Sequence, residues 1–526
     1  MIRLRQIKIE VNKDSSDYLK EKIIKKLNIK RDDLVDYEII KKSIDARDKR
    51  EIYYSYEIDV ILKNESKIKK NKDILEIVKE EYSYPKEGEH TLEYRPVIVG
   101  SGPSGLFAAY LLAELGYTPL VIERGEKVED RVNTVNKFWK EGILNPNSNV
   151  SFGEGGAGTF SDGKLNTLTG DNSRINKVFD IFVSSGAPRE IKYINKPHIG
   201  TDILRKVIIN MRNKIINMGG EFRYNTTLTD IIVENNKVTK IIVNNKEQID
   251  CNCLVLAIGH SARDTFKMLY DKKIEMKPKS FAVGVRIQHK QEMINENQYG
   301  KYSKILPSAS YKLTHKASNG RGVYTFCMCP GGFVVNSSSE ENHLIINGMS
   351  NYNRDEENAN SAVVVTVGPS DFGTNPLDGI EFQRRLEAMA YTKGLGRIPT
   401  QLYKDYKENK ITKEFGDILP IFKGDYTFAN LNEIFPEYIN ESIKEAIDAF
   451  DKKIKGFARS DAILSGVESR TSSAVRIERN ENFESSINGI YPAGEGSGYS
   501  GGITTSAIDG IKVAEKIIEK YKSLNN

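Results

Sequence analysis

One stretch of sequence, RPVIVGSGPSGLFAAYLLAELGYTPLVIER at residues 95–124, constrains the fold more than any other. It opens with a short apolar segment, 96–99, that predicts a buried strand. Three glycines follow in a GxGxxG spacing: Gly100, Gly102 and Gly105. Glycine at these positions permits a tight turn, close approach of the backbone to a pyrophosphate, and close packing of the next helix. The pattern predicts a Rossmann-type dinucleotide-binding fold, against the alternative of a plain glycine-rich turn.

A carboxylate closes this unit. The second predicted strand, 119–122, ends at Glu123, which lies 18 positions after Gly105 (123 minus 105). An acidic side chain at the tip of this strand is suited to bind two ribose hydroxyls. A glutamate there also argues against the 2′-phosphate of NADP, but it does not distinguish NAD from FAD.

Three further segments favour FAD. In NVSFGEGGAGTFSDGKLNT, residues 149–167, glycines form a loop whose backbone can approach a flat or phosphorylated group, with a plain flexible loop as the alternative. A return strand, 254–259, ends in Gly259 and would bring the chain back under the cofactor. The third segment is GIYPAGEGSGYSGGITTSAIDGIKVAEKIIEKY, residues 489–521, a second strand-to-helix turn without the glycine spacing for another nucleotide.

This second turn is suited to the other half of the same cofactor. Glu495 can hydrogen-bond a ribityl hydroxyl, and N–H groups near Gly502 and Ile503 can face N1 and the C2 carbonyl of a flavin. A helix N-terminus there stabilises the negative charge that flavin reduction brings. We therefore expect two separated glycine turns to bind opposite ends of one FAD. The candidate cofactor-binding residues are Gly100, Gly102, Pro103, Ser104, Gly105, Glu123, Arg124, Gly155, Gly156, Gly158, Gly259, Gly494, Glu495, Gly502 and Ile503.

Length and hydrophobic patterning predict three parts, because 526 residues are too many for one core. Residues 1–92 predict a small α+β module of βαββα order, with strands at 3–11, 38–44 and 52–62 and helices at 16–27 and 73–80. The predicted fold class is α/β: a Rossmann-type FAD-binding domain at 93–275 and 455–526, interrupted at 276–454 by a mostly antiparallel α+β substrate domain. Helices are expected near 201–218, 379–392 and 438–451.

Charge and hydropathy give little support to a nucleic-acid or membrane partner. The chain has 77 Lys+Arg and 72 Asp+Glu, a net charge of +5, and residues 1–92 hold 22 basic and 20 acidic side chains. A packing or dimerisation role for this module is therefore favoured over RNA binding. No run reaches the roughly 18 apolar residues that a membrane span needs, and the first residues lack the apolar centre of a signal peptide. We expect a cytoplasmic protein, and its oligomeric state stays open.

The four cysteines form two pairs, Cys251/Cys253 and Cys327/Cys329. Residues two apart on a strand lie about 6.6–7 Å apart, so Cys327 and Cys329 would need a local bend before Pro330 to form a disulfide. A redox role is one hypothesis for this pair, and buried or cleft-lining thiols are the other. Cys251 and Cys253 lead into a core strand, which predicts inert packing. A zinc site pooled from both pairs lacks the usual CxxC spacing, and no metal is expected.

The sequence identifies no catalytic residue. Several polar side chains are candidates for a substrate pocket, and for each the alternative is an ordinary structural role because none forms a motif. They are His198, His260, His289, His315, His343, Arg286, Glu468 and Arg470.

These motifs resemble those of known flavoproteins. GSGPSG, VIER, LVLAIG and YPAGEGSGYSGGI are similar to motifs of the glutathione-reductase-type FAD fold over 93–275 and 455–526. FGEGGAGTFSDGKLNT, MKPKSFAVGVRIQH, TFCMCPGGFVVNSSSE and GVESRTSSAVRI resemble, over nearly the whole chain, the bacterial FAD-dependent dehydrogenase family sometimes labelled NAD-utilizing dehydrogenases. The resemblance implies that Gly100, Gly102 and Gly105 contact pyrophosphate, that Glu123 binds the adenosine ribose and that Gly155 to Gly158 approach the flavin. One departure is Glu495, where many related flavoproteins carry aspartate.

The predicted function is that of an FAD-dependent dehydrogenase in which hydride passes through flavin N5 and the inserted domain selects a small-molecule substrate. No second strand–GxGxxG–helix unit is present, so NADH or NADPH, if it is the donor, would bind transiently. Two alternatives stay open. One is an FAD-dependent RNA-modifying enzyme that uses residues 1–92 to bind RNA, and the other is a non-catalytic flavin-binding regulatory protein.

Overall fold

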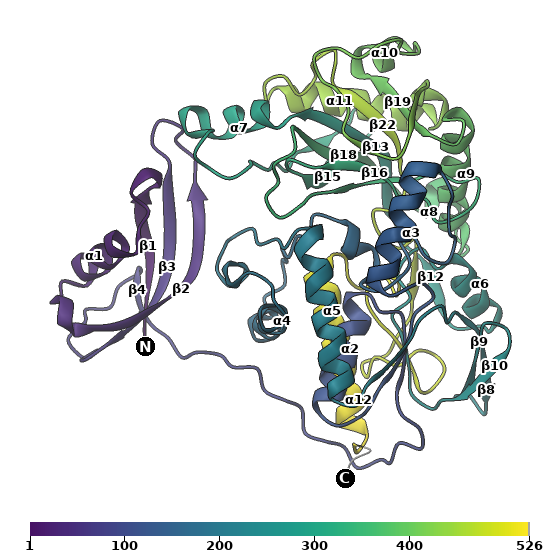
Figure 1. Ribbon diagram of the computed structural model, residues 1–526, viewed down its shortest axis with the longest axis horizontal. Coiled ribbons are helices and arrows are strands. Elements are labelled where there is room, and N and C mark those ends of the chain that lie inside the picture. Colours follow the sequence, from purple (N-terminus) through teal and green to yellow (C-terminus); the bar gives the residue numbers. More distant parts are fainter. Residues whose placement is uncertain (524–526) are drawn as a thin grey trace.

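A small module forms the N-terminal part of the chain, which the computed structural model describes from residue 1 to residue 523. Figure 1 shows this module beside the rest of the molecule, with a long connector leading away from it. Its antiparallel sheet has the order β2-β3-β1-β4, and α1 packs Leu19, Ile23 and Leu27 into the same core. The predicted strands and first helix are confirmed. The elements are β1 (Ile2–Glu10), α1 (Ser16–Leu27), β2 (Leu34–Asp45), β3 (Tyr53–Leu62) and β4 (Ile74–Glu76).

The helix predicted at 73–80 is wrong, because Ile74–Glu76 form strand β4. This short strand pairs antiparallel with the start of β1, with Ile2 opposite Glu76 and Leu4 opposite Ile74. Ile74 is buried in the core of the module. Pairing with the free edge of β1 and burial of Ile74 outweigh the helical propensity of this segment, and the module is therefore βαβββ.

The module and its connector both contact the second body. The backbone N–H of Lys42 on β2 donates to the carbonyl oxygen of Tyr193 at 2.7 Å, and the N–H of Asn195 returns a bond to Lys42 at 2.9 Å. Further along, the N–H of Gly88 donates to Ile518 and that of His90 donates to Lys520. The connector thus runs along the end of the last helix.

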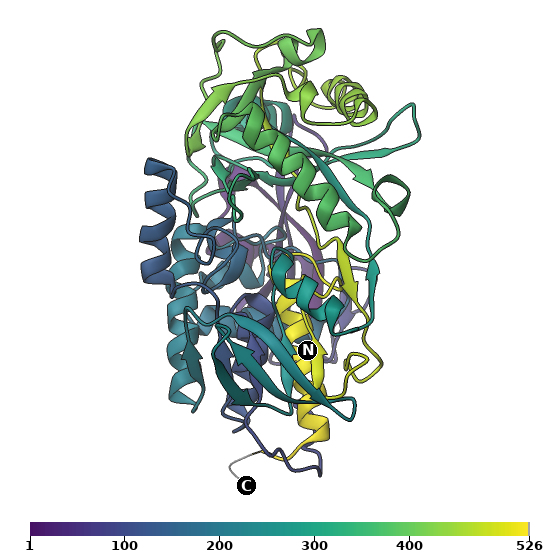
Figure 2. The same ribbon diagram turned by 90° about the vertical axis from the view of Figure 1, so that its right-hand side faces the viewer.

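The second body is built on a parallel five-stranded sheet of order β24-β11-β5-β6-β7. Its outer strand β24 comes from the far end of the chain, and in Figure 2 the C-terminal helix α12, in yellow, stands in this body below the green inserted domain. Both faces of the sheet are covered, as the continuous apolar strands require. The elements are β5 (Val97–Val99), β6 (Leu120–Ile122), β7 (Glu221–Arg223), β11 (Leu254–Leu256), β24 (Ile490–Pro492), α2 (Pro103–Glu114), α5 (Thr201–Asn217) and α12 (Ile503–Lys520).

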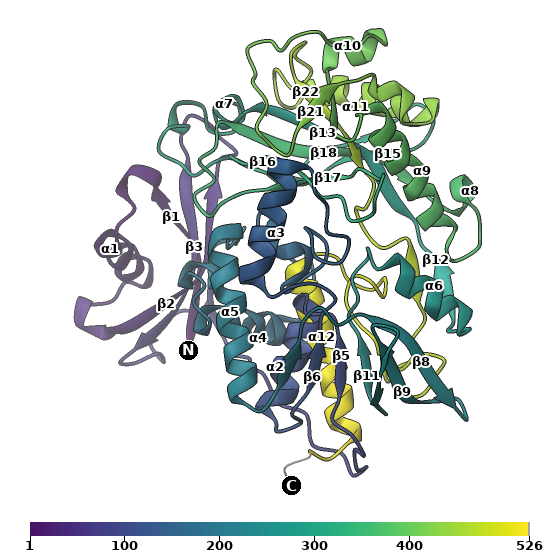
Figure 3. The same ribbon diagram turned by 45° about the vertical axis from the view of Figure 1, so that its right-hand side comes forward.

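Alternate residues of the strands enter two different cores. Ile98 packs with the residues of α2, α5 and α12, whereas Val97 and Val99 pack with an antiparallel meander of order β10-β9-β8. Figure 3 shows β8 and β9 beside β11 and away from α5. The predicted helix, meander and return strand are confirmed. The remaining elements of this body are α3 (Val128–Glu141), α4 (Asn172–Ser184), β8 (Leu228–Glu234), β9 (Lys237–Val243), β10 (Glu247–Asp250) and α6 (Arg263–Asp271).

The third body contains a seven-stranded sheet of order β14-β15-β18-β13-β22-β19-β21, in which every neighbouring pair except β19–β21 is antiparallel. The predicted antiparallel character and the helices near 379–392 and 438–451 are confirmed by α9 and α11. The sheet and its helices are β13 (Phe281–Lys290), α7 (Gln291–Tyr299), β14 (Thr314–Lys316), β15 (Gly322–Cys329), β18 (Asn358–Val367), α8 (Pro369–Phe372), α9 (Asp378–Lys393), β19 (Ile398–Leu402), α10 (Tyr403–Glu408), β21 (Tyr426–Phe428), α11 (Glu437–Asp451) and β22 (Ile463–Glu468).

Two small sheets complete the structure. One pairs β12 with β23, and the other has the order β17-β16-β20. Over residues 1–523, no helix is both long and apolar enough to cross a bilayer. The strands of these sheets are β12 (Met276–Pro278), β16 (Phe333–Asn336), β17 (Ile346–Met349), β20 (Phe422–Lys423) and β23 (Val475–Ile477).

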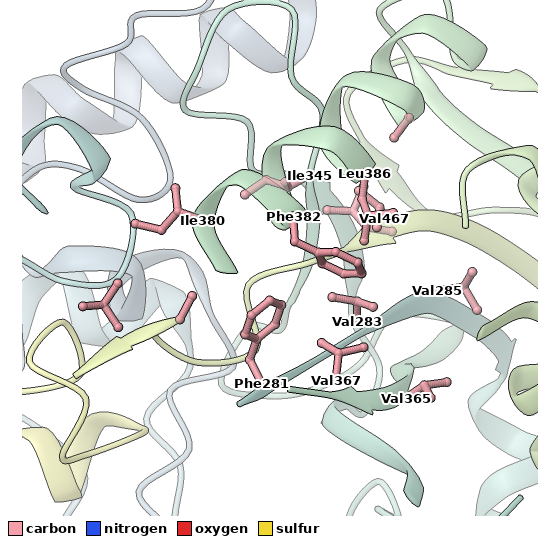
Figure 4. Close-up of a cluster of buried hydrophobic side chains, with 14 of the residues drawn as sticks. Phe281, Val283, Val285, Ile345, Val365, Val367, Ile380, Phe382, Leu386 and Val467 are labelled. Atoms are coloured by element: carbon pink, nitrogen blue, oxygen red, sulfur yellow. The ribbon is translucent and has the colours of Figure 1, made fainter. Parts of the chain in front are cut away.

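The core of the third body lies between α9 and the sheet. In Figure 4, Phe382 of α9 points toward Val283 and lies near Phe281, while Val367 and Val365 line the neighbouring strand. The rings of Phe281 and Phe382 meet edge to face with centroids 6.3 Å apart.

The position of β22 bears on the domain boundaries. Residues 463–468 fall in the segment that we assigned to the FAD-binding domain, yet β22 pairs with β13 and β19 of the seven-stranded sheet. The three-domain division stays a prediction, and we propose that its second boundary lies after β22 rather than at residue 455.

Candidate functional site

The first glycine turn follows β5 and opens α2. Gly100 has φ +99°, and a Cβ atom there would lie 2.3 Å from the carbonyl oxygen of Ala257. Gly105 faces Gly100, whose carbonyl oxygen would lie 1.9 Å from a Cβ on Gly105. Gly102 is the N-cap of α2 and Pro103 is its first residue. Because the first N–H groups of a helix have no intrahelical acceptor, this turn offers donors and partial positive charge to an anion.

Glu123, at the end of β6, accepts hydrogen bonds that hold this turn in place. One carboxylate oxygen accepts from the N–H and O–H of Ser101 at 2.9 and 2.7 Å. The other accepts from the N–H groups of Gly125 and Gly153, both at 3.0 Å. A ribose hydroxyl would therefore share a carboxylate that already accepts four hydrogen bonds, about its full capacity. The ribose contact of Glu123 stays a prediction.

The glycine-rich loop at 153–163 packs directly on the first turn. The N–H of Gly155 donates to the carbonyl oxygen of Ser101 at 2.8 Å, and a Cβ on Gly156 would lie 3.1 Å from the Cα of Gly102. Gly155 has φ +83°, and a Cβ there would meet Thr159 at 2.2 Å. The loop continues into a short 3₁₀ helix, η3 (Gly156–Phe160).

Arg131 of α3 holds this loop from inside. Its fully buried guanidinium donates to five backbone carbonyl oxygens at 2.7 to 3.1 Å, those of Asn149, Val150, Gly153, Glu154 and Gly156. Burial lowers the pKa of Arg131 to about 9, so the side chain still carries its charge at neutral pH. Sequence reasoning missed this residue, because nothing in its local pattern distinguishes it from a surface arginine on a helix.

The second glycine turn meets the first one. A Cβ on Gly494 would lie 2.7 Å from the Cβ of Ser104, and one on Gly510 of α12 would lie 2.1 Å from the carbonyl oxygen of Ser104. Asp509 of α12 accepts from the N–H of Gly494 at 2.7 Å. Gly502 is the N-cap of α12. The two helices therefore begin side by side at one end of the sheet.

A single cleft joins these turns to the third body. Thirteen of the fifteen residues predicted to bind the cofactor line it. Gly105 and Gly155 do not line it, because they serve backbone packing behind its wall. The lining predicted residues are Gly100, Gly102, Pro103, Ser104, Glu123, Arg124, Gly156, Gly158, Gly259, Gly494, Glu495, Gly502 and Ile503.

The cleft fits a dinucleotide that carries phosphates. Ser104 is 5% exposed and its hydroxyl oxygen has no hydrogen-bond partner within the protein. A Cβ on Gly102 would meet only the Cα of Gly156, at 3.8 Å, so this glycine leaves open space in the cleft. Near the end of β6, Arg124 stacks on Phe152 at 4.6 Å and donates to Asp264 at 2.7 Å. Orphaned donors around an open glycine turn are what a bound pyrophosphate requires.

The inner wall of the cleft comes from the third body and is polar. Arg286 is fully buried and donates to Glu468 at 3.0 Å, to Asn347 at 3.2 Å and to the carbonyl oxygen of Cys327 at 3.2 Å. Burial raises the pKa of Glu468 above its usual range. Of these residues, Asn347, Cys327 and Glu468 line the cleft.

The polar residues that the sequence offered as substrate-pocket candidates fall into two groups, those that line the cleft and those that do not. His260, Glu468 and Arg470 line the cleft, and His260 Nδ1 lies 3.5 Å from a carboxylate oxygen of Glu495. His289 is buried against the carbonyl oxygen of Phe457. The others do not line it: His198 stacks on Tyr352, His315 pairs with Glu445, and His343 is bonded to the backbone of Glu341.

Lys164 is a cleft residue that sequence reasoning did not single out, although it lies inside the quoted glycine-rich segment. Its ammonium lies 2.7 Å from Asp162, which Arg354 also contacts at 2.9 Å. These two cations hold the pKa of the Asp162 carboxyl below its usual range against the effect of burial. Within residues 1–523, no group of three or more His, Cys, Asp or Glu side chains is placed to hold a metal.

Comparison with known proteins gives three family matches and one close relative. Residues 280–471 match the FAD-dependent protein, C-terminal domain-like family, residues 98–136 match an NAD(P)-binding Rossmann-like domain, and residues 1–61 match a domain of unknown function (DUF8436). A protein of Clostridium beijerinckii, described as uncharacterized, is 49% identical over 531 residues, which cover 99% of each chain.

Solved flavoenzymes share only a distant likeness. Glycine oxidase from Bacillus cereus is 12% identical, with 82% of this chain and 96% of that chain covered and a TM-score of 0.32. L-proline dehydrogenase from P. horikoshii is 13% identical, with coverage of 84% and 96% and a TM-score of 0.32. These scores are too low to support an argument about function. The close relative and the matched domains decide the matter: the chain belongs to the family of the Clostridium beijerinckii protein and is an FAD-dependent protein with a Rossmann-like nucleotide-binding domain.

Proposed function

We propose that this chain is an oxidoreductase in which FAD, held in the cleft, exchanges hydride with a small-molecule substrate presented by the third body. The observation that carries the proposal is the shared cleft, because two glycine turns at two helix N-termini form one wall and polar residues of the inserted domain form another. A cofactor site bordered by a second domain is a common arrangement for substrate selection.

Each part of the cleft has a proposed role. The turn from Gly100 to Ser104 binds the pyrophosphate at the start of α2, and Glu123 binds the adenosine ribose. Glu495, Gly502 and the adjoining loop glycines bind the ribityl chain and the flavin. Bound FAD supplies hydride transfer through N5. The residues themselves position the cofactor and exclude water from its reactive end.

On the substrate side, Glu468 is our candidate for a proton carrier. A buried carboxyl with a raised pKa keeps its proton over a wider pH range than an exposed one, which suits a general acid. Lys164 and Arg470 line the same cleft, but Asp162 and Glu387 pair with them, so these two charges are already balanced within the protein.

We also propose that the chain has a glutathione-reductase-type FAD fold and belongs to the NAD-utilizing dehydrogenases, because its motifs resemble theirs. NADH or NADPH would then be the electron donor. The N-terminal module, with its balanced charge, contacts the FAD-binding body through Lys42 and Tyr193, which favours a packing role over RNA binding.

Two measurements test the proposed function. The purified chain should be yellow and release FAD on denaturation, identified by its mass. Under anaerobic conditions, NADH or NADPH should bleach the flavin absorbance. A colourless protein that binds no FAD on reconstitution would overturn the proposal, whereas flavin that neither nucleotide bleaches would remove only the nicotinamide donor.

A further inference from the structure

Strand β15 is interrupted where it reaches the cleft. Its pairing with β18 runs regularly to Phe326 opposite Ala362 and then resumes at Cys329 opposite Asn360, so β15 has one residue more than its partner. Cys327, within this bulge, has φ +43°, a conformation that side-chain-bearing residues seldom adopt. Bulges of this kind redirect side chains near functional sites. Here the bulge turns Cys327 into the cleft lining, while Cys329 stays fully buried behind it.

The bulge also brings the two thiols together. Cys329 Sγ donates to the carbonyl oxygen of Cys327 at 3.4 Å, so the inner thiol lies directly against the residue that carries the outer one. A regular strand would hold such a pair at the edge of disulfide reach, and the bulge is the local bend that a bond between them needs. Both thiols are free in this structure.

The surroundings shift the pKa values of the two thiols in opposite directions. The neighbouring Cys329 thiol lowers the pKa of the Cys327 thiol, and the positive charges of Lys164 and Arg286 lower it further, against burial and the charge of Asp162. The neighbouring Cys327, together with burial, raises the pKa of Cys329. The outer sulfur therefore favours the thiolate and the inner one keeps its proton, as in an attacking and a resolving thiol.

The other cysteine pair shows what inert packing looks like in this chain. Cys251 and Cys253 are fully buried beside β11, and neither lines the cleft. Burial raises the pKa of Cys251 to about 12 and raises that of Cys253 as well. Packing alone requires neither a positive φ nor nearby cations, so the features of Cys327 call for another explanation.

We propose that Cys327 and Cys329 form a redox-active dithiol that exchanges two electrons with the FAD bound in the same cleft. This inference rests on the proposed function, because FAD is the partner in the exchange. In the oxidising direction, the Cys327 thiolate and the Cys329 thiol form a disulfide. Both electrons and the Cys329 proton pass to FAD, which becomes FADH⁻, so that atoms and charge balance. In the reverse direction, FADH⁻ reduces the disulfide and restores the thiolate and the thiol.

The test is an anaerobic dithionite titration of the flavin-loaded full chain, compared among wild type, Cys327→Ser, Cys329→Ser and the matched control Cys251→Ala. The wild type, first oxidised in air, and the control should take up one two-electron equivalent more than their flavin requires. The two serine variants should take up the flavin equivalent alone. Equal uptake by wild type and Cys327→Ser would overturn the proposal.

A second measurement on the wild type does not depend on variants. In the oxidised protein, the peptide with Cys327 and Cys329 should resist iodoacetamide under denaturing conditions and be two hydrogens lighter than its dithiol form. After reduction it should take two alkyl groups. Full alkylation of the oxidised protein that does contain flavin would refute the dithiol and leave the proposed function standing. Protein that binds no flavin would refute both.

Discussion

The replacement Gly102→Ala tests the pyrophosphate site without breaking the fold. Gly102 has φ −72° and ψ −177°, which alanine adopts freely, and the added methyl would meet only the Cα of Gly156 at 3.8 Å. By contrast, a methyl on Gly105 would lie 1.9 Å from the carbonyl oxygen of Gly100 and would displace α2. Of these two glycines, Gly102 is the one at which the new methyl enters the open space of the cleft.

The expected effect falls on cofactor binding rather than on folding. The methyl would keep the phosphate from the backbone N–H groups, and one hydrogen bond to a charged group contributes about 1.5–3 kcal/mol. FAD should therefore bind roughly 10- to 100-fold more weakly. The loss of an N-cap glycine and the stiffer unfolded chain act in opposite directions, so the free energy of unfolding of the apoprotein should change by less than about 1 kcal/mol.

The assay is titration of apoprotein with FAD, followed by the change in flavin fluorescence, for wild type, Gly102→Ala and Gly170→Ala. Gly170 is a matched control because a Cβ there would meet nothing within 4 Å and it does not line the cleft. Urea unfolding of each apoprotein checks the fold. If Gly102→Ala folds normally and binds FAD as tightly as wild type does, the pyrophosphate does not lie at this turn.

Three further predictions concern the supporting structure. Phe382→Ala should lower the free energy of unfolding by about 3–5 kcal/mol, measured by urea denaturation, because its ring fills the core between α9 and the sheet. Arg131→Met should weaken FAD binding, measured by the same titration, because five loop carbonyl oxygens lose their donor. Burial lowers the pKa of His289 to about 4, so between pH 6.5 and 4 the unfolded chain binds a proton that the native state does not, and stability falls as pH falls. His289→Gln should remove up to about 1.4 kcal/mol of this dependence per pH unit.

The glycine turns could be predicted from sequence because their requirements are local. Gly105 packs against the carbonyl oxygen of Gly100 within a single strand–turn–helix unit, and the GxGxxG spacing reflects that geometry. We expected both turns to serve one cofactor, and the chain places Gly494 against Ser104, almost four hundred positions away. Motifs therefore predicted one wall of the cleft.

Other parts of the site depend on contacts that no motif records. Arg131, Asn347 and Lys164 reach their positions through long-range packing of α3, β17 and the glycine loop, and their residue types are ordinary. The bulge at Cys327 arises from a mismatch in the pairing of β15 with β18, which only the assembled sheet reveals. Strand β4 was missed for the same reason, since a three-residue strand exists only beside its partner.

The route of the chain through the parallel sheet has a consequence for biosynthesis. The outer strand β24 and helix α12 are made after the inserted domain, yet α12 packs on α2 and its first residues line the cofactor cleft. A ribosome-bound chain that has not yet released residues 490–520 exposes the apolar face of α2 and holds half a binding site. Cofactor binding is then a late event. An early stop codon in this last segment would leave an aggregation-prone chain that cannot bind FAD.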